Sequence, residues 1–308
     1  MTHQPASPRM PDIGRGIAWM VLTTLLFVAV TGIVRYLGSS LPAVEAAFIR
    51  YAFGLALVMP VLVRLRPGLP DGRTMGLFVW RGLAHCVAVM LWFFAMARIP
   101  IAEVTAIGYT APIFVTIGAA VFLGERLQAR RIGAIVAGFV GALIILRPGF
   151  QDIALGSLAQ LAAAPAFAVS FLLAKKLTAR NDPAFIVFML SAMCTLVLAP
   201  GAFYQWRTPA LDELYWLALV AVFATAGHYT LTRAFQAAPI TVTQPVGFIQ
   251  LVWAALLGMV AFDEPLDPYV FAGGGLVVAA ASYISHREAR AARRARGPLT
   301  PPAPATKV

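Results

Sequence analysis

Charged residues are scarce in this sequence. Only 12% of its 308 residues are Asp, Glu, Lys or Arg, whereas soluble domains carry about a quarter. The hydrophobic fraction is 60%, and the mean hydropathy is +0.80. The apolar residues form long runs instead of the alternation that half-buried strands need. A water-soluble fold is therefore excluded, and the chain is expected to lie in lipid.

Cysteine is scarce as well, with only Cys86 and Cys194. Both fall inside apolar runs, where the disulfide framework of a secreted protein has no place. The sequence also lacks a His-Glu-x-x-His zinc motif and a Gly-x-Ser-x-Gly turn. We therefore expect no metal, no cofactor and no enzymatic activity.

Ten apolar runs are long enough to cross a bilayer, which takes ~20 residues per helix. A closed β-barrel would need strands that alternate apolar and polar residues, and runs such as Ile132 to Leu146 do not alternate. The predicted fold is an all-α integral membrane protein with ten transmembrane helices. The predicted spans are 14–36, 43–63, 75–97, 101–123, 130–147, 153–175, 183–204, 213–235, 241–262 and 267–286.

Basic residues are distributed unevenly between the two sides of these spans. Both termini and the loops after the even-numbered spans share the basic side. The opposite side holds only Arg35, Arg98, Arg147 and Arg207. The positive-inside rule places the basic side in the cytoplasm. We expect a multi-pass protein of the bacterial inner membrane with both termini cytoplasmic.

The segment 287–308 is basic at first and then Pro-rich. It is predicted to be a disordered cytoplasmic tail that contacts anionic lipid headgroups. Membrane topology accounts for the net charge of +11, so nucleic acid is not an expected partner.

The chain repeats itself at an offset of 139 residues. The matched positions are Pro100 and Pro239, Gly108 and Gly247, Tyr109 and Phe248, and the turns Gly124-Glu125-Arg126-Leu127 and Asp263-Glu264-Pro265-Leu266. With a shift of one residue, the match extends to Gly16 and Gly156, Phe27 and Phe167, Arg35 and Lys175, and Pro60 and Pro200. The repeats are 14–147 and 153–286, with five spans each. Because five is odd, the second repeat is expected to be inverted, as in secondary transporters whose substrate site lies near the midplane.

These paired halves, the Leu-Gly-Glu-Arg-Leu and Phe-Asp-Glu-Pro-Leu turns and the Gly-rich fifth and tenth spans resemble the EamA family of the drug/metabolite transporter superfamily. The resemblance covers nearly the whole chain. Within the superfamily the chain is most similar to amino-acid exporters of the YddG type. This similarity implies facilitated movement of aromatic and other neutral amino acids.

Polar groups within spans tend to face the bundle interior or a water-filled cavity. In the third span Arg81, His85, Val89 and Trp92 share one helical face. In the eighth span His228 aligns with Val89 through the repeat. His85, Trp92 and His228 are therefore candidate substrate-binding residues, and hydrogen-bonded packing histidines are the alternative. Arg81 is expected to extend to the cytoplasmic headgroups.

The fourth and ninth spans are expected to form the wall between the halves. Tyr109 in the fourth, with Gln244, Gln250 and Trp253 in the ninth, are the remaining candidate substrate-binding residues. Small glycines in the fifth and tenth spans are expected to let helices approach closely.

Pro112 and Pro245 interrupt the same two spans. Proline has no amide hydrogen, so it leaves the carbonyls of Gly108 and Thr241 without their helical partners. We interpret both prolines as positions of helix breaking or gating. A tolerated kink is the alternative.

No carboxylate is obvious near the middle of a span, because Glu45, Glu103, Glu125, Asp263 and Glu264 all lie near span ends. The expected substrate is a small neutral or zwitterionic metabolite, with amino acids, including aromatic ones, as the leading class. The expected partners are this small molecule and membrane lipid, and the chain is expected to be a monomer.

Two other functions stay open. A proton-coupled drug or cation efflux antiporter would need His85 or His228 as its proton carrier. A membrane-embedded enzyme would need a nucleophile with its base, a carboxylate pair or metal ligands inside the bundle.

The orientation can be tested by single-cysteine labelling after Cys86 and Cys194 have been removed. We expect Leu69→Cys to react only from the cytoplasmic side and Gly149→Cys only from the opposite side, because of the distribution of basic residues. The reverse pattern would contradict this orientation, and reaction of both positions from both sides would indicate dual insertion.

Overall fold

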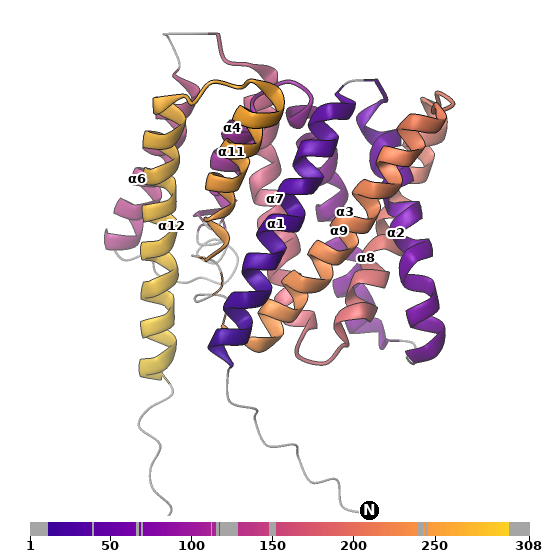
Figure 1. The fold of residues 1–308 in the computed structure, drawn as a ribbon. Helices are drawn as coiled ribbons and strands as arrows, with labels where there is room; N and C mark the ends of the chain where they lie inside the picture. Colours follow the sequence, from indigo (N-terminus) through magenta and orange to yellow (C-terminus); the bar gives the residue numbers. More distant parts are fainter. Residues whose placement is uncertain are drawn as a thin grey trace, which may run out of the picture.

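The computed structural model describes residues 12–38, 40–65, 68, 70–111, 113–114, 117, 129–147, 152–239, 243 and 246–295. These ranges contain ten α-helices and no strand, which agrees with the predicted all-α fold. Figure 1 shows the helices packed side by side, with α6 and α12 at one end of the bundle and α2 at the other. The helices are α1 (Ile13–Leu37), α2 (Ala43–Leu65), α3 (Gly72–Met96), α4 (Ile101–Gly108), α6 (Ala129–Leu146), α7 (Leu155–Leu177), α8 (Pro183–Tyr204), α9 (Leu211–Ala237), α11 (Gln250–Phe262) and α12 (Pro268–Ala295).

Most of these bounds lie within a few residues of the predicted spans. Six helices, α1, α2, α3, α7, α8 and α9, are long and apolar enough to cross a membrane, judged by length and composition. Shorter apolar stretches occupy 132–146, 250–262 and 268–283. The two exceptions are the fourth and ninth predicted spans, which α4 and α11 cover only in part.

Polar caps fix where several helices begin. Asp71 accepts a hydrogen bond from the Thr74 amide, 2.7 Å away, and so satisfies one of the unpaired amides at the start of α3. Hydrogen bonds from the Thr74 side chain and, second, from its amide lower the pKa of the exposed Asp71 carboxyl. Asp182 caps α8 in the same way, directly before Pro183 at the first helical position. At the C-terminal end of α1, Gly38 has a φ of +60°, a conformation that favours glycine.

The helices pack in pairs that respect the sequence repeat. The 139-residue offset relates α1 to α7, α2 to α8, α3 to α9 and α6 to α12. The main packing partners are α1 with α9, α3 with α7, α2 with α8, and α6 with α12. Exchanging the two halves turns the first of these pairs into the second and leaves the other two unchanged. The packing is therefore symmetric under exchange of the repeats.

The segment after the last predicted span differs from the expectation. Residues 287–295 continue α12 instead of being disordered, and 296–308 lie outside the described residues. The sequence of this part consists mostly of Ala, Arg and Glu, which have high helix propensity, so a helix that begins in the membrane can continue through them.

The contact between α6 and α12 depends on glycine. A Cβ atom on Gly141 would lie 2.7 Å from the carbonyl oxygen of Gly273, and a Cβ atom on Gly273 would lie closer still to the Gly141 carbonyl. By contrast, a Cβ atom on Gly275 has no described neighbour within 4 Å. The expected close helix packing at glycines is therefore confirmed at Gly141 and Gly273, and the structure shows that the two Gly-rich helices are packing partners.

We expect Gly141→Ala to lower the free energy of unfolding by about 1–3 kcal/mol, because the added methyl group forces the two backbones apart. Gly275→Ala is the matched control and should leave stability unchanged or slightly raised. Thermal unfolding of the detergent-purified variants measures both effects. Equal melting temperatures would contradict the role of this contact.

Candidate functional site

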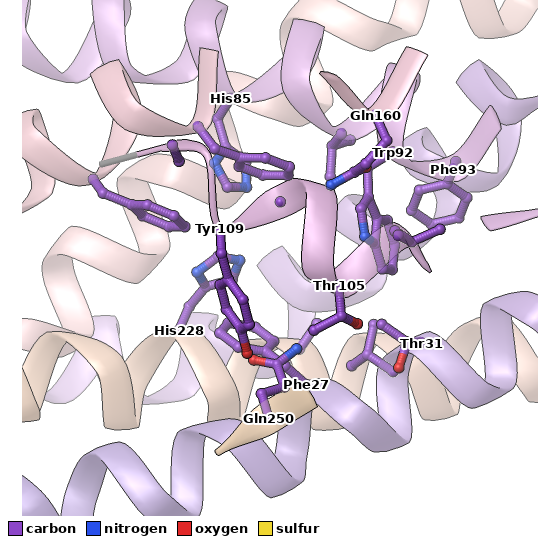
Figure 2. Close-up of a pocket in the computed structure, with 18 of the residues that line it drawn as sticks. Phe27, Thr31, His85, Trp92, Phe93, Thr105, Tyr109, Gln160, His228 and Gln250 are labelled. Carbon is purple, nitrogen blue, oxygen red and sulfur yellow. The ribbon is translucent and has the colours of Figure 1, made fainter. Parts of the chain in front are cut away.

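A central cavity of about 210 Å³ lies between the halves. Figure 2 shows its side chains around one space, with His85, Gln160 and Trp92 in the upper part of the view and His228, Gln250 and Thr31 in the lower part. The lining is mostly apolar and comes from α1, α2, α3, α4, α7, α9 and α11. The described lining residues are Phe27, Val30, Thr31, Arg50, His85, Val89, Trp92, Phe93, Val104, Thr105, Gly108, Tyr109, Ala111, Gln160, Phe167, Phe171, Ala224, His228 and Gln250.

Two interrupted helices meet at this cavity. α4 ends at Gly108 and is followed by a turn at 109–110, while a turn at 248–249 precedes α11. The amide of Thr110 donates to the Ile107 carbonyl at 3.0 Å, and the amide of Ile249 donates to the Val246 carbonyl at 3.2 Å. These two bonds are counterparts at the offset of 139 residues. The predicted continuous spans 101–123 and 241–262 are therefore broken at equivalent positions.

The two breaks contact each other. The rings of Tyr109 and Phe248, which are counterparts in the repeat, have centroids 4.7 Å apart. The Tyr109 hydroxyl donates to the Gly247 carbonyl at 3.1 Å. Residues that correspond through a twofold exchange touch one another only near its axis. The breaks therefore lie where the two halves meet.

The predicted histidines lie next to each other in the cavity wall. The ring centroids of His85 and His228 are 5.1 Å apart. His85 Nδ1 lies 3.0 Å from the Ser170 hydroxyl, whereas its buried Nε2 has no hydrogen-bond partner among the described residues. The rings of Phe27 and His228 pack edge to face, and so do those of Phe167 and His85. The Nε2 atom of His85 is thus a buried polar atom in the cavity wall without a partner among the described residues.

The structure brings together five of the candidate residues. His85, Trp92, Tyr109, His228 and Gln250 all line the cavity. Trp253 does not, and it packs against the main hydrophobic core instead, because it lies one helical turn beyond the break. Gln244, Pro112 and Pro245 lie outside the described residues.

Several lining residues were missed by the sequence analysis. α1 and α7 contribute Phe27, Phe167 and Gln160, and α2 contributes Arg50. Phe27 and Phe167 already stood out as a matched pair in the repeat. Arg50 also carried a signal, because an arginine well inside a predicted span is costly unless it faces a polar space.

Arg81 lies elsewhere than predicted. It is 2% exposed, and its guanidinium donates to the Ile186 carbonyl at 3.2 Å instead of extending to the headgroups. The reason is that α8 packs against α3 at this depth and offers a carbonyl that the sequence pattern of α3 alone does not reveal.

Within the part of the chain that the structure describes, no cluster of three or more His, Cys, Asp or Glu residues could hold a metal ion. Cys86 and Cys194 are both buried free thiols. The arrangement is that of a ring-lined cavity with a few polar groups, which can bind a small solute.

A family model of EamA-like transporters matches the chain twice, over residues 14–147 and 154–286. The chain belongs to the EamA-like transporter family. It is accordingly a multi-pass membrane protein built of two EamA-like repeats.

Curated relatives cover nearly the whole of this EamA-like chain. A riboflavin transporter of Rhizobium johnstonii is 32% identical over 91% of this chain and 93% of its own length. An S-adenosylmethionine uptake transporter of Rickettsia bellii is 27% identical over 90% of this chain and 95% of its own length. A pseudopaline exporter of Pseudomonas aeruginosa is 29% identical over 88% of this chain and 95% of its own length. These relatives are named for riboflavin, S-adenosylmethionine and pseudopaline and not for amino acids, so the predicted similarity to YddG-type exporters is not supported.

A solved crystal structure of another protein has a TM-score of 0.59 at 18% identity and covers 89% of this chain and 97% of that chain. At this identity the likeness concerns the fold alone.

Corresponding basic residues fasten the two ends of the EamA-like bundle. Arg35, at the end of α1, donates to the Met96 carbonyl at 3.2 Å and forms a 3.0 Å ion pair with Glu264. Glu264 also accepts from the amide of Ile101 at 2.9 Å. Together these contacts join α1, α3, α4 and the end of α11. We call this set the Arg35 clamp.

The counterpart of Arg35, Lys175 at the end of α7, donates to the carbonyls of Phe235 and Ala238. Phe235 corresponds to Met96 through the repeat. The start of α1 bonds to the same end of α9, through the Asp12 amide and the Ala237 carbonyl at 3.1 Å. Lys175 therefore lies at the opposite end of the bundle from the Arg35 clamp.

We expect Glu264→Gln to raise access to the cavity from the Arg35 end. Removal of a partly exposed ion pair costs about 1 kcal/mol, which corresponds to about a fivefold change in an opening equilibrium. A single cysteine at Thr105, a lining residue, should react correspondingly faster with an impermeant thiol reagent applied from that side.

Asp267→Asn provides the control, because it removes a second arginine–carboxylate pair, between Arg147 after α6 and Asp267 before α12. If both variants change the reaction rate equally, the Arg35 clamp does not control access.

Proposed function

We propose that this chain moves small organic metabolites that carry an aromatic or heteroaromatic ring across the bacterial inner membrane by alternating access. The observation that carries the proposal is the central cavity at the paired helix breaks. Discontinuous helices leave backbone groups free at mid-membrane, and irregular backbone is tolerated there only where it is buried in protein or lines a cavity.

The lining favours a flat ring. Phe27, Trp92, Tyr109, Phe167 and Phe171 surround the cavity with aromatic faces and edges. Aromatic pairs add ~0.5–1.5 kcal/mol each beyond the burial of area, which supports selectivity and still permits release. Two glutamines, two threonines and the two imidazoles supply hydrogen bonds to the polar part of the solute.

The relatives support this class. Riboflavin and S-adenosylmethionine, which name two of them, both contain a flat heteroaromatic ring system. The named relatives include an uptake system and an exporter, so direction does not follow from the family. Aromatic amino acids fit the same description and stay within the proposed class.

The small volume of the cavity supports a transporter whose two halves change their relative position. Ligand pockets usually hold about 300–1,000 Å³, and the present cavity of about 210 Å³ is smaller. A solute as large as riboflavin would require the halves to separate. The helix breaks and the clamps at the two ends provide the places where such a separation can occur.

The symmetric packing supports an inverted repeat, and the distribution of basic residues supports cytoplasmic termini. Exchange of the halves preserves the helix pairs, and the Arg35 clamp and Lys175 lie at opposite ends. In such a plan, each conformation closes one end and opens the other.

Proton-coupled exchange is a second candidate, favoured by the adjacent His85 and His228 rings. A cation that has no carboxylate of its own is disfavoured as substrate, because no described lining residue carries a carboxylate and Arg50 is a lining residue.

Flux into proteoliposomes that contain only this protein tests the proposal with riboflavin, S-adenosylmethionine, L-tryptophan and the ring-free L-alanine. We expect Trp92→Ala to reduce flux of the transported ring-bearing solutes about twofold to tenfold, because one aromatic contact is lost. L-Alanine flux should change little.

Trp80→Ala is the matched control, since Trp80 lies on the same helix and is 67% exposed. Equal loss for every solute in Trp92→Ala would mean that the ring only packs the bundle. Flux that strictly requires a pH gradient would replace facilitated diffusion by the proton-coupled candidate.

A further inference from the structure

The most unusual residue of the cavity wall is Arg50 on α2. It is only 5% exposed, although it lies among apolar and aromatic lining residues. Its guanidinium carbon lies 3.8 Å from the centre of the Tyr51 ring, so an aromatic face covers one side of the charge. No carboxylate in the described ranges forms an ion pair with it.

A buried cation without an anionic partner is energetically costly. Arg81 is also a buried cation without an ion pair among the described residues, but its guanidinium donates to the Ile186 carbonyl and it lies outside the cavity lining. Arg50 instead keeps its charge beside an open space. A fixed positive charge in such a place is complemented best by an anion that enters that space.

We infer that Arg50 binds a carboxylate group of the transported solute, so that the substrate is a ring-bearing carboxylate. This inference rests on the proposed function and specifies the charge of its substrate. The planar guanidinium matches the two oxygens of a carboxylate, and charge-assisted hydrogen bonds of this kind are about twice as strong as neutral ones.

The cavity favours a single negative charge. Apart from Arg50 and the two imidazoles, the described lining residues are uncharged. A phosphate monoester would bring a second charge that Arg50 alone does not balance, and a cation would be repelled. A carboxylate at Arg50 leaves the rest of the solute among the aromatic rings.

Three ligands that share a phenylpropyl skeleton, together with phenyl phosphate, separate the effect of charge from that of the ring. Binding of hydrocinnamate, hydrocinnamamide, phenylpropylamine and phenyl phosphate to the purified full-length protein can be measured by calorimetry. We expect hydrocinnamate to bind at least about tenfold more tightly than its amide, because one charge-assisted pair is gained. Phenylpropylamine and phenyl phosphate should bind more weakly than hydrocinnamate.

The variants assign the preference to one residue. Arg50→Gln should bring the affinities for hydrocinnamate and its amide to within about threefold of each other, while binding of the amide persists. Arg50→Lys, which keeps the charge but not the planar fork, should retain part of the preference. Arg64→Gln is the matched control, since Arg64 is an exposed residue of the same helix and should leave all affinities unchanged.

The inference is overturned if hydrocinnamate and its amide bind equally to the unmodified protein, or if Arg50→Gln keeps the carboxylate preference. Tighter binding of phenyl phosphate than of hydrocinnamate would overturn it too. Loss of amide binding in both Arg50 variants would also contradict it, because Arg50 would then support the structure of the cavity. If the unmodified protein binds none of these ring-bearing ligands, the proposed function fails, whereas binding without a charge preference removes only the role of Arg50.

Discussion

In the hydrocarbon of a membrane, each backbone amide and carbonyl needs a partner within the protein, because lipid offers none. α1, α2, α3, α7, α8 and α9 meet this constraint as uninterrupted helices. The breaks at 109–110 and 248–249 meet it differently, with tighter hydrogen bonds to the third residue back and with the Tyr109 hydroxyl on the Gly247 carbonyl. Because such breaks cannot face lipid, they lie at the centre, and this requirement places the cavity.

The sequence repeat also makes the helix packing symmetric under exchange of the two halves. Every main helix pair either maps onto another pair or onto itself when the halves are exchanged. The same relation holds for local contacts, since Arg35 and Lys175 reach the carbonyls of the corresponding residues Met96 and Phe235. Because corresponding contacts occur in both halves, such a bundle can form two related packings. This is the physical basis of the proposed alternating access.

The hydrophobic runs predicted the number and bounds of most helices, because the thickness of a bilayer fixes the length of a spanning helix. The repeat likewise predicted that the fourth and ninth spans meet, and Tyr109 lies against Phe248 there. Gln250 lines the cavity and Trp253 does not, but the sequence did not distinguish them. The span was predicted as one unbroken helix, so the faces of the helix after the break could not be related to those before it.

Helical periodicity assigns residues to a face of their own helix, and it does not say which neighbour covers that face. Arg81 was predicted to reach the headgroups, because the Ile186 carbonyl that binds it belongs to another helix. For the same reason Arg50 and the residues of α1 and α7 were not predicted to line the cavity. Their common signal was a polar residue or a repeated aromatic residue inside a span.

One departure from the symmetry of the repeat has an energetic consequence. Tyr109 donates to the Gly247 carbonyl, but its counterpart Phe248 has no hydroxyl group to donate to the carbonyl of Gly108. In the proposed alternating access, the halves exchange their conformations, and this hydrogen bond would then have no equivalent. An intramolecular hydrogen bond contributes about 0.5–1.5 kcal/mol, a factor of about two to ten in a two-state population. Under that proposal, a single oxygen atom would make the two conformations of the resting protein unequal in abundance, even when no solute and no gradient is present.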